Sequence, residues 1–343
     1  MSFDITLHPS GERFAAEEGE SVLDAALRAG LNLPHSCRGG SCRSCQARLL
    51  SGEVAYPNGL PRALSAEDSS SGQALLCQAR ARSDLTVEAR RMETPGNIQI
   101  RRLPCRVQRL ERFSHDVMGL FLKLPGFEPF EFLAGQYLDI LLRGGGRRSF
   151  SIASPPHDSQ LLELHVRRVP GGAFTERVFD DMAERTLLRF EGPLGQFFLR
   201  EDSERPILMM AGGTGYAPLK SMLRHAFHVG IARPIHLYWG VRSRRDLYDA
   251  ERLARWVARR DSFAFTPVLS EPLAADDWRG RRGLVHRVLL EDEPDLSAMD
   301  VYMAGPPPMI ESARQDFATA GLAPAHLFFD SFEYGAASQK TGG

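Results

Sequence analysis

The chain lacks any run of apolar residues approaching the roughly 18 that a membrane-spanning helix requires. We expect no secretory leader, because residues 1–4 lead directly into a strand-like pattern. Lysine occurs only at Lys123, Lys220 and Lys340, and the formal net charge is −1 rather than strongly positive. We therefore expect a cytoplasmic protein that neither inserts into a membrane nor has nucleic acid as a partner.

Cysteine is rare, with five residues in 343, but four of the five follow one spacing. Three of them form a Cys-x4-Cys-x2-Cys loop, and the fourth lies farther along the chain. This is the spacing of plant-type [2Fe–2S] ferredoxins. Gly39 and Gly40 supply the backbone freedom that a loop around inorganic sulfide needs. The sequence therefore predicts a [2Fe–2S] cluster, whose four thiolate ligands are Cys37, Cys42, Cys45 and Cys77.

Other uses of these cysteines fit less well. A structural zinc site more often shows two Cys-x2-Cys pairs or includes histidines. Disulfides are disfavoured in a reducing cytoplasm. Cys105 lies outside the spacing, in strand-like sequence, and is expected to be a small buried hydrophobic residue.

The pattern of strands and helices divides the chain into domains. Residues 1–92 form the first, with strands at 3–7 and 46–50 and at 85–89, a return strand opening at Phe14, and a helix capped by Ser21 and stopped by Gly30. A Pro-Gly pair within a charged run marks 90–97 as a linker.

Residues 99–202 are strand-rich, which predicts a small antiparallel barrel. Its strands are expected at 106–113, 117–124, 136–142, 148–153 and 161–168, with one helix from Ala173. Residues 203–335 alternate strands with helices, which predicts an α/β parallel sheet with a nucleotide site at the carboxyl ends of its strands. The strands are expected at 207–211, 235–241, 263–269, 301–304 and 327–329, and the helices at 217–229, 247–258, 285–290 and 309–320. Residues 336–343 are expected to be a flexible tail.

Two motifs in the barrel region are suited to a phosphate-bearing ring cofactor. In Arg148-x-Phe150-Ser151, an arginine can pair with a diphosphate, an aromatic ring can stack on a flat ring, and a hydroxyl can bond a ring nitrogen. The segment 171–175, Gly-Gly-Ala-Phe-Thr, precedes a helix whose N–H groups could hold phosphate. A plain hairpin turn is the alternative for this second motif.

Two further motifs stand at strand ends in the α/β region. Gly212-Gly213-Thr214-Gly215 follows an apolar strand and opens a helix, as a pyrophosphate-binding loop does. It is neither a Gly-x-Gly-x-x-Gly fingerprint nor a P-loop. The segment 304–309, Ala-Gly-Pro-Pro-Pro-Met, repeats the strand-to-helix pattern.

With the cysteine spacing, these motifs in this order resemble the ferredoxin–NADP reductase superfamily over nearly the whole chain. The similarity is greatest to its three-domain members, which include the reductase components of benzoate- and phenol-type oxygenases and the CDP-6-deoxy-delta-3,4-glucoseen reductase type. The resemblance implies a multidomain fold: a β-grasp 2Fe-2S ferredoxin (α+β), an antiparallel β-barrel FAD-binding domain, and a Rossmann-like α/β NAD(P)-binding domain with a parallel sheet.

The resemblance also implies roles for individual residues. The residues that would contact FAD are Arg148, Phe150, Ser151, Ile152, His165, Val166, Gly171, Gly172, Ala173 and Thr175. Those that would contact the nicotinamide dinucleotide are Gly212, Gly213, Thr214, Gly215, Pro218, Gly305, Pro306 and Met309. Two residues would act at the reacting ring, Ser151 near flavin N5 and Phe332 over one flavin face. For Phe332 the alternative is a core residue at a strand end. Ala304 replaces a cysteine that is frequent in the family, so no thiol positions the nicotinamide here.

By the same resemblance, the chain would take hydride from NADH or NADPH onto FAD and pass single electrons through the cluster to an electron-acceptor protein. That acceptor would be an oxygenase or a deoxysugar dehydrase component. The alternative is a redox sensor. Such a sensor would need an additional effector domain, and no segment remains for one. Arginines at 242, 244 and 245 taken alone favour NADPH, whereas the three-domain members favour NADH, which we expect here.

The cluster loop carries two arginines, Arg38 and Arg43, and no acidic residue. One hypothesis is that both raise the cluster potential and face an acidic patch on the acceptor. The alternative is that both are solvated loop charges.

Overall fold

The computed structural model describes residues 2–35, 38–40, 43–90, 98–126, 130–144, 146–159 and 161–332. The chain divides into two compact units, Met1–Ile100 and Arg101–Gly343. The predicted linker residues 91–97 and the predicted tail 336–343 lie outside the described residues. The predicted boundaries at 92/99, 202/203 and 335 stay predictions.

The first unit is built on a five-stranded sheet in the order β2-β1-β7-β3-β5. Its main elements are β1 (Ser2–His8), β2 (Arg13–Glu17), α1 (Val22–Arg28), β3 (Gln46–Ser51), β5 (Gln73–Leu75) and β7 (Leu85–Glu88). As predicted, Ser21 caps α1, its side chain accepting a hydrogen bond from the Asp24 N–H. The sequence analysis missed β5 and the short elements β4 (Val54–Ala55), α2 (Ala66–Ser70) and β6 (Arg80–Ala81). Elements of two to five residues are too short to display a full period.

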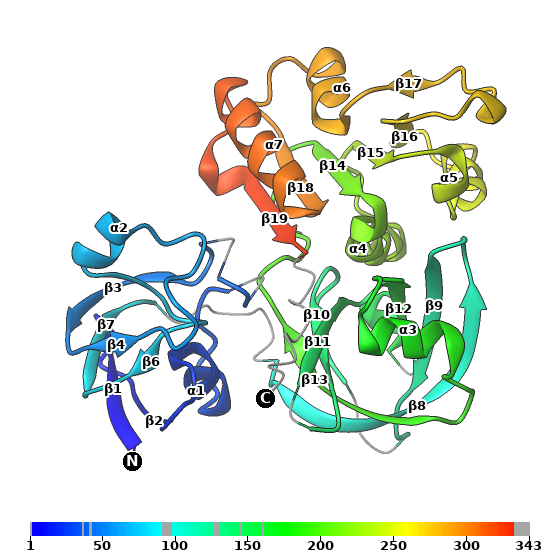
Figure 1. The fold of residues 1–343 in the computed structure, drawn as a ribbon. Coiled ribbons are helices and arrows are strands. Elements are labelled where there is room, and N and C mark those ends of the chain that lie inside the picture. The colour runs from blue at the N-terminus through cyan, green and yellow to red at the C-terminus, as the bar shows by residue number, and fades with distance from the viewer. Residues whose placement is uncertain are drawn as a thin grey trace. The chain divides into compact units, whose positions relative to one another are not determined.

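The second unit begins with a six-stranded antiparallel sheet in the order β11-β10-β13-β8-β9-β12. Its strands are β8 (Arg101–Arg112), β9 (Val117–Lys123), β10 (Tyr137–Leu141), β11 (Arg147–Ser151), β12 (Leu161–Arg167) and β13 (Leu187–Leu194). A bridge between Ile152 and Leu164 joins the two edge strands and closes the barrel (Figure 1). The helix α3 (Ala173–Asp180) contributes Phe174 and Val178 to the barrel core. The sequence analysis missed β13, whose Gly-Pro pair interrupts the apolar pattern.

The same unit continues into a parallel sheet in the order β17-β16-β15-β14-β18-β19. Its strands are β14 (Ile207–Gly212), β15 (Ile235–Val241), β16 (Phe263–Leu269), β17 (Arg281–Arg282), β18 (Asp300–Gly305) and β19 (Leu327–Ser331). The longer helices are α4 (Tyr216–Val229), α5 (Ala250–Val257), α6 (Val285–Asp292) and α7 (Pro307–Thr319). All of these strands and helices except β17 were predicted. Short 3-10 helices are η1 (Pro156–Asp158), η2 (Gly213–Gly215), η3 (Arg244–Asp246), η4 (Ala274–Asp276) and η5 (Pro324–His326).

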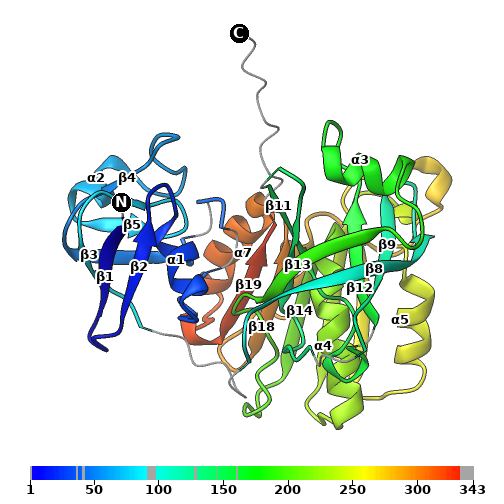
Figure 2. The ribbon, with the colours of Figure 1, turned by 90° about the horizontal axis from the view of Figure 1, so that it is seen from below.

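Helices cover both faces of the parallel sheet, as Figures 1 and 2 show. Met209 of β14 packs in one core with α4 and α5, and the neighbouring Met210 packs in another with α6 and α7. Both methionines are fully buried, so the strand is apolar along its whole length. The chain runs outward from β14 through β15 and β16, and it returns to the other side of β14 as β18. This reversal is a topological switch point, where ligands of such sheets bind.

None of the described helices combines the length and the apolar character needed to cross a bilayer.

Adjacent residues of β13 point to opposite sides of the barrel wall and provide a test of the fold. Leu188 is 8% exposed in the core, whereas Leu187 is 75% exposed. Leu188→Ala should lower the free energy of unfolding by about 2–5 kcal/mol, because it removes buried apolar contacts and leaves a cavity. Leu187→Ala, the matched control, should change it by no more than about 0.5 kcal/mol. Denaturant unfolding measures both, and equal effects would contradict this barrel register.

Candidate functional site

The glycine loop after β14 packs against the end of β18 with no room for side chains. A Cβ on Gly215 would lie 1.9 Å from the Ala304 carbonyl oxygen, and one on Gly212 would lie 2.6 Å from the Met309 Sδ. Gly213 has a φ of +54° and its carbonyl accepts a hydrogen bond of 2.9 Å from the Trp239 indole N–H. The predicted segments 212–215 and 304–309, remote in sequence, therefore meet at the switch point.

This backbone arrangement fits a dinucleotide. The loop passes through η2 into α4, a helix of 14 residues, whose N-terminal N–H groups favour negative charge. Thr214 and Pro218 are buried at this end. Pro306 is the N-cap of α7, and prolines follow it in the first turn, where their missing N–H costs no helical hydrogen bond.

The predicted flavin strand, β11, ends beside the parallel sheet. Ser151 is buried, and its hydroxyl lies 3.4 Å from Oδ2 of Asp330 on β19, within hydrogen-bond distance. Asp330 pairs in register with Ala304 of β18. The contact therefore brings the flavin motif to the same strand ends as the nicotinamide motif. The other motif residues lie half-buried: Arg148 donates to the Arg147 carbonyl, and the Phe150 ring packs 5.5 Å from the Phe174 ring.

The segment 171–175 forms the N-terminus of α3, as predicted. A Cβ on Gly172 would lie 2.7 Å from the Thr175 hydroxyl and 2.9 Å from the Val169 carbonyl, so only glycine fits. The Gly171 N–H, however, donates a 2.9 Å hydrogen bond to the Glu176 carboxylate. Any phosphate at this turn would compete with that carboxylate, which leaves the first N–H groups of the helix, from Ala173 onward, as its donors.

Alternate residues of β12 point to opposite faces of the strand and contact different neighbours. Val166 and Ile152 are both fully buried in the barrel core. His165 points the other way, and both of its ring nitrogens are occupied: Nε2 by the Glu163 carboxylate at 2.9 Å and Nδ1 by the Tyr248 hydroxyl at 2.9 Å. Contacts from His165 and Val166 to a flavin would therefore come from their backbone.

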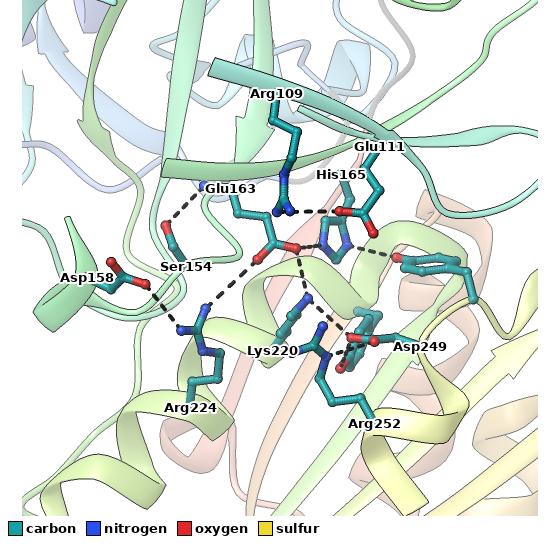
Figure 3. Close-up of polar contacts among 12 residues, drawn as sticks. Arg109, Glu111, Ser154, Asp158, Glu163, His165, Lys220, Arg224, Asp249 and Arg252 are labelled. Carbon is teal, nitrogen blue, oxygen red and sulfur yellow. Dashed lines mark hydrogen bonds and ion pairs between the residues drawn. The ribbon is translucent and has the colours of Figure 1, made fainter. Parts of the chain in front are cut away.

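Figure 3 shows a buried polar cluster that joins the barrel to the parallel-sheet domain. Its centre is Lys220 of α4, 2% exposed, whose Nζ lies 2.8 Å from Oε1 of Glu163 and 3.2 Å from Oδ2 of Asp249. We call Lys220, Glu163, Asp249, His165, Tyr216 and Tyr248 the interdomain polar cluster. Tyr216 completes it by donating a 3.0 Å hydrogen bond to Asp249.

The electrostatics of this cluster fix its protonation. Burial opposes ionisation of Glu163, but the hydrogen bond from His165 and the ammonium of Lys220 outweigh it and hold the pKa of Glu163 well below its usual range. Burial lowers the pKa of His165 and raises the pKa of Tyr248 well above its usual range. Tyr248 therefore donates to the neutral imidazole, which donates from Nε2 to the ionised Glu163. The sequence analysis missed this cluster, although a lysine within a buried helical stretch of an arginine-rich chain was a signal of it.

Phe332 follows β19, and its N–H donates a 2.9 Å hydrogen bond to the Gly305 carbonyl. Its half-buried side chain packs against the core on the α4 face of the sheet. This packing agrees with the alternative that Phe332 is a core residue. Because the side chain is only half-buried, part of it stays exposed. Its role over a flavin stays a prediction.

The candidate cluster site lies in the first unit. Cys45 and Cys77 are buried, whereas Cys37 and Cys42 lie outside the described residues. Burial raises the pKa of Tyr56, and both Cys45 and Cys77 add to that shift, so these two cysteines lie near one tyrosine. Such a convergence of thiols from two distant segments suits an iron–sulfur cluster.

The loop backbone between the cysteines is compact. Gly40 has a φ of +82°, and a Cβ there would lie 2.9 Å from the Pro61 Cβ. Arg38 and Arg43 also have positive φ, at 53° and 60°, a conformation uncommon outside glycine. These three described residues therefore give the tight turns that a loop around a cluster needs.

The two loop arginines are paired within their own domain. Arg38 forms an ion pair with Asp24 of α1, and Arg43 forms one with Asp68 of α2. Neither arginine is therefore simply solvated. Because each charge is offset by a neighbouring carboxylate, the hypothesis that they raise the cluster potential loses most of its electrostatic basis.

Cys105 is 3% exposed in β8 within the barrel core, as predicted. Burial raises the pKa of its thiol to about 12, so it stays protonated and unreactive.

Cys77 and Cys105 form a matched pair for testing the cluster site. Cys77→Ser should abolish or strongly reduce the visible absorbance and the iron content of the purified protein, because a ligand thiolate is lost. Cys105→Ser should leave both unchanged. Full iron content in the Cys77 variant would show that this residue is not a ligand.

His165 should make stability depend on pH. Because its pKa in the folded protein is lowered below 6.5, the unfolded chain binds the proton more readily, and stability is lost as pH falls from 6.5 toward the folded-state pKa. Glutamine at this position retains one donor and one acceptor without titrating. The melting temperature of the wild type should therefore fall more steeply between pH 7 and pH 5 than that of His165→Gln. Parallel curves would contradict a buried neutral imidazole.

Three family models match successive parts of the chain. Residues 5–82 match the family described as a 2Fe-2S iron-sulfur cluster binding domain. Residues 104–199 match the oxidoreductase FAD-binding domain, and residues 209–315 match the oxidoreductase NAD-binding domain.

Individual proteins are similar along nearly their whole length. The CDP-6-deoxy-L-threo-D-glycero-4-hexulose-3-dehydrase reductase of Yersinia pestis is 39% identical over 97% of this chain and 99% of its own. The reductase component DmpP of a Pseudomonas phenol 2-monooxygenase is 33% identical, over 97% and 95%. The crystal structure of the Amycolatopsis cytochrome P450 reductase GcoB superposes with a TM-score of 0.84, at 36% identity over 96% and 98% of the two chains. The chain therefore belongs to the three-domain ferredoxin–FAD–NAD reductases, which take electrons from NAD(P)H and pass them through FAD and a [2Fe–2S] cluster to a partner protein.

Proposed function

We propose that this reductase is cytoplasmic, uses NADH, and delivers its electrons to a hexulose dehydrase component. The observation that supports the placement of its reacting groups is the contact of Ser151 with Asp330, which joins the flavin motif to the strand ends of the nicotinamide motif. An oxygenase component is the second candidate for the acceptor.

The residues proposed to hold the cofactors are those that meet around this contact. Arg148 and the N-terminus of α3 would hold the FAD diphosphate, and Phe150 would lie along the flavin. Ser151 would approach flavin N5. The loop 212–215 and the segment 305–309 would hold the nicotinamide dinucleotide through backbone groups, because no Cβ fits at Gly212 or Gly215. Cys37, Cys42, Cys45 and Cys77 would hold the cluster.

Bound FAD would supply the conversion of an electron pair into single electrons, which is chemistry of the cofactor rather than of the chain. The chain's own residues orient and shield. Ser151 is buried, so water is excluded around its hydroxyl. The backbone of Ala304 and Gly305 at the end of β18 packs against Gly215 and Gly212, which holds the two proposed nicotinamide segments together.

The turn after β15 supports NADH. Asp246 is 8% exposed and its Oδ2 accepts hydrogen bonds from the Ser243 N–H at 2.9 Å and hydroxyl at 3.0 Å. Arg244 is engaged with Asp276 through two 3.2 Å hydrogen bonds. A carboxylate in this turn suits a free ribose hydroxyl and repels a 2′-phosphate. Arg242 and Arg245, both exposed, are the groups that would favour NADPH instead.

Sequence similarity supports the dehydrase as acceptor. The Yersinia reductase named for a hexulose dehydrase is 39% identical to this chain, and the reductase component of phenol 2-monooxygenase is 33% identical. A cytoplasmic site is supported by the cluster thiols, which persist in a reducing compartment.

A turnover assay tests the proposal. The purified holoprotein should support turnover of a CDP-hexulose dehydrase in the presence of NADH, and kcat/KM for NADH should exceed that for NADPH by about tenfold or more. A phenol-type oxygenase component in the same assay should receive electrons much more slowly. Faster electron transfer to the oxygenase component would identify that component as the acceptor. Equal use of NADPH would show that Arg242 and Arg245 bind the 2′-phosphate.

A further inference from the structure

The contact between the barrel and the parallel-sheet domain contains an ammonium group with almost no access to water. Lys220 is 2% exposed, and its Nζ bridges a carboxylate of the barrel, Glu163, and a carboxylate beside α5, Asp249 (Figure 3). Both carboxylate side chains are also largely buried, at 7% and 14% exposure. Lys220 thus joins charges from two domains at one point, and the two carboxylates are paired further with Arg224 at 3.9 Å and Arg252 at 2.9 Å.

Stability alone is a poor explanation of this arrangement. Removing an ammonium and a carboxylate from water costs several kcal/mol for each ion, and apolar residues of similar volume often pack as well or better. What a buried ion pair with satisfied hydrogen bonds supplies is a unique geometry, because alternative registers would leave a charge unpaired. Lys220 is also one of only three lysines, in a chain whose other cations are arginines.

Lys220 and Glu163 lie on the two elements that carry the predicted cofactor-binding segments. Lys220 is in the second turn of α4, the helix that opens directly from the loop 212–215. Glu163 is on β12, the predicted second flavin segment. Ser221, next to Lys220, donates a 2.7 Å hydrogen bond to the carbonyl of Ser154, which follows the flavin strand β11. One turn of α4 therefore holds both flavin segments.

A closed set of contacts makes this link stiff. The Glu163 N–H donates a 3.1 Å hydrogen bond to the Ser154 hydroxyl, which connects β12 to the segment after β11. The Phe113 ring of the barrel stacks on Tyr248 with centroids 5.8 Å apart, and Nζ of Lys220 lies 5.8 Å from the centroid of the Phe113 ring. Aromatic rings from both domains thus exclude water from the ion pairs, which strengthens them.

We propose that Lys220 is a positioning residue that sets the register of the flavin barrel on the nicotinamide domain, and so the distance between the two reacting rings. It touches neither cofactor-binding loop with its ammonium and acts through Glu163 and Asp249. This inference rests on flavin reduction by NAD(P)H and not on the identity of the acceptor. Without Lys220 the domains would still associate, but in a less defined register.

The test compares Lys220→Met with Lys123→Met in the holoprotein. Both changes remove one lysine charge, but Lys123 is exposed on β9, and its side chain makes no hydrogen bond or ion pair with the described residues. Anaerobic stopped-flow absorbance measures flavin reduction by NADH. For Lys220→Met we expect the rate constant at saturating NADH to fall roughly 10- to 100-fold, as expected for a small misplacement of reacting atoms, with FAD content and the Kd of NADH unchanged. Lys123→Met should behave as the wild type.

A second measurement, independent of turnover, reports on the contact between α4 and the barrel. Hydrogen–deuterium exchange of the holoprotein without nucleotide should show faster exchange in β12 and in residues 212–220 of Lys220→Met, and no change in Lys123→Met. Unchanged exchange in these segments would contradict the proposal. If the wild type itself is not reduced by NADH or NADPH, the reductase activity fails rather than the role of Lys220.

A double variant separates positioning from simple stability. Lys220→Met leaves Glu163 with only the Arg224 guanidinium, at 3.9 Å, as a cationic partner, while Asp249 keeps Arg252 at 2.9 Å. Its melting temperature should therefore fall, and adding Glu163→Gln should restore part of that loss. If Lys220 positions the domains, the double variant regains melting temperature but not the rate of flavin reduction. Recovery of both together would make the role purely structural and overturn the proposal, as would a wild-type rate in Lys220→Met.

Glu163→Gln alone serves if Lys220→Met does not fold. It retains the pair of Lys220 with Asp249 but removes the charge that links α4 to the barrel. Flavin reduction should slow without loss of FAD, and a wild-type rate would overturn the proposal.

Discussion

The second unit depends on one close approach of backbone to backbone, where the loop after β14 meets the end of β18. A side chain at Gly215 would overlap the Ala304 carbonyl, and one at Gly212 would overlap Met309. Because nothing larger than hydrogen fits, the two strand ends present bare peptide groups at the switch point of the sheet. The helix α4 starts there, and the barrel docks against its flank. The position of the flavin motif relative to the nicotinamide motif thus follows from a contact that only glycine permits.

That docking is held by charge as well as by apolar packing. In the interdomain polar cluster, three buried charges, Lys220, Glu163 and Asp249, lie where apolar side chains could also have packed. Every member of the cluster forms a hydrogen bond or an ion pair with another member. Electron transfer between cofactors demands a constant arrangement of domains more than a large stability, and in some proteins a buried ion pair fixes one register at a cost in stability. The paired arginines of the cluster loop, Arg38 and Arg43, follow the same logic on a smaller scale, since each fastens the loop to a helix of its own domain.

Local pattern predicted most of the elements and failed where a strand carried a mixed pattern. The strand β14 was predicted within a residue because both of its faces are buried and its apolar run is continuous, and the bounds of β15 and β16 were predicted as the structure has them. In contrast, β13 was missed although it lies in the middle of the barrel sheet, because its Gly-Pro pair and exposed Leu187 resemble a loop. His165 was predicted as a flavin contact from its motif, yet both of its ring nitrogens belong to the cluster with Glu163 and Tyr248.

Short-range spacing was enough to predict the cysteine ligands and the glycine loops and to identify the order of the three domains, because each is encoded within one loop or one strand-to-helix turn. Contacts between distant positions were not encoded in this way. Lys220 and Glu163 are 57 residues apart, and Ser151 and Asp330 are 179 apart. No periodicity links such pairs, since their proximity depends on how the barrel closes and how the sheet reverses at β14. The sequence by itself therefore identified the cofactors. Only the packing of the two domains determined which buried charges hold the predicted cofactor sites in register.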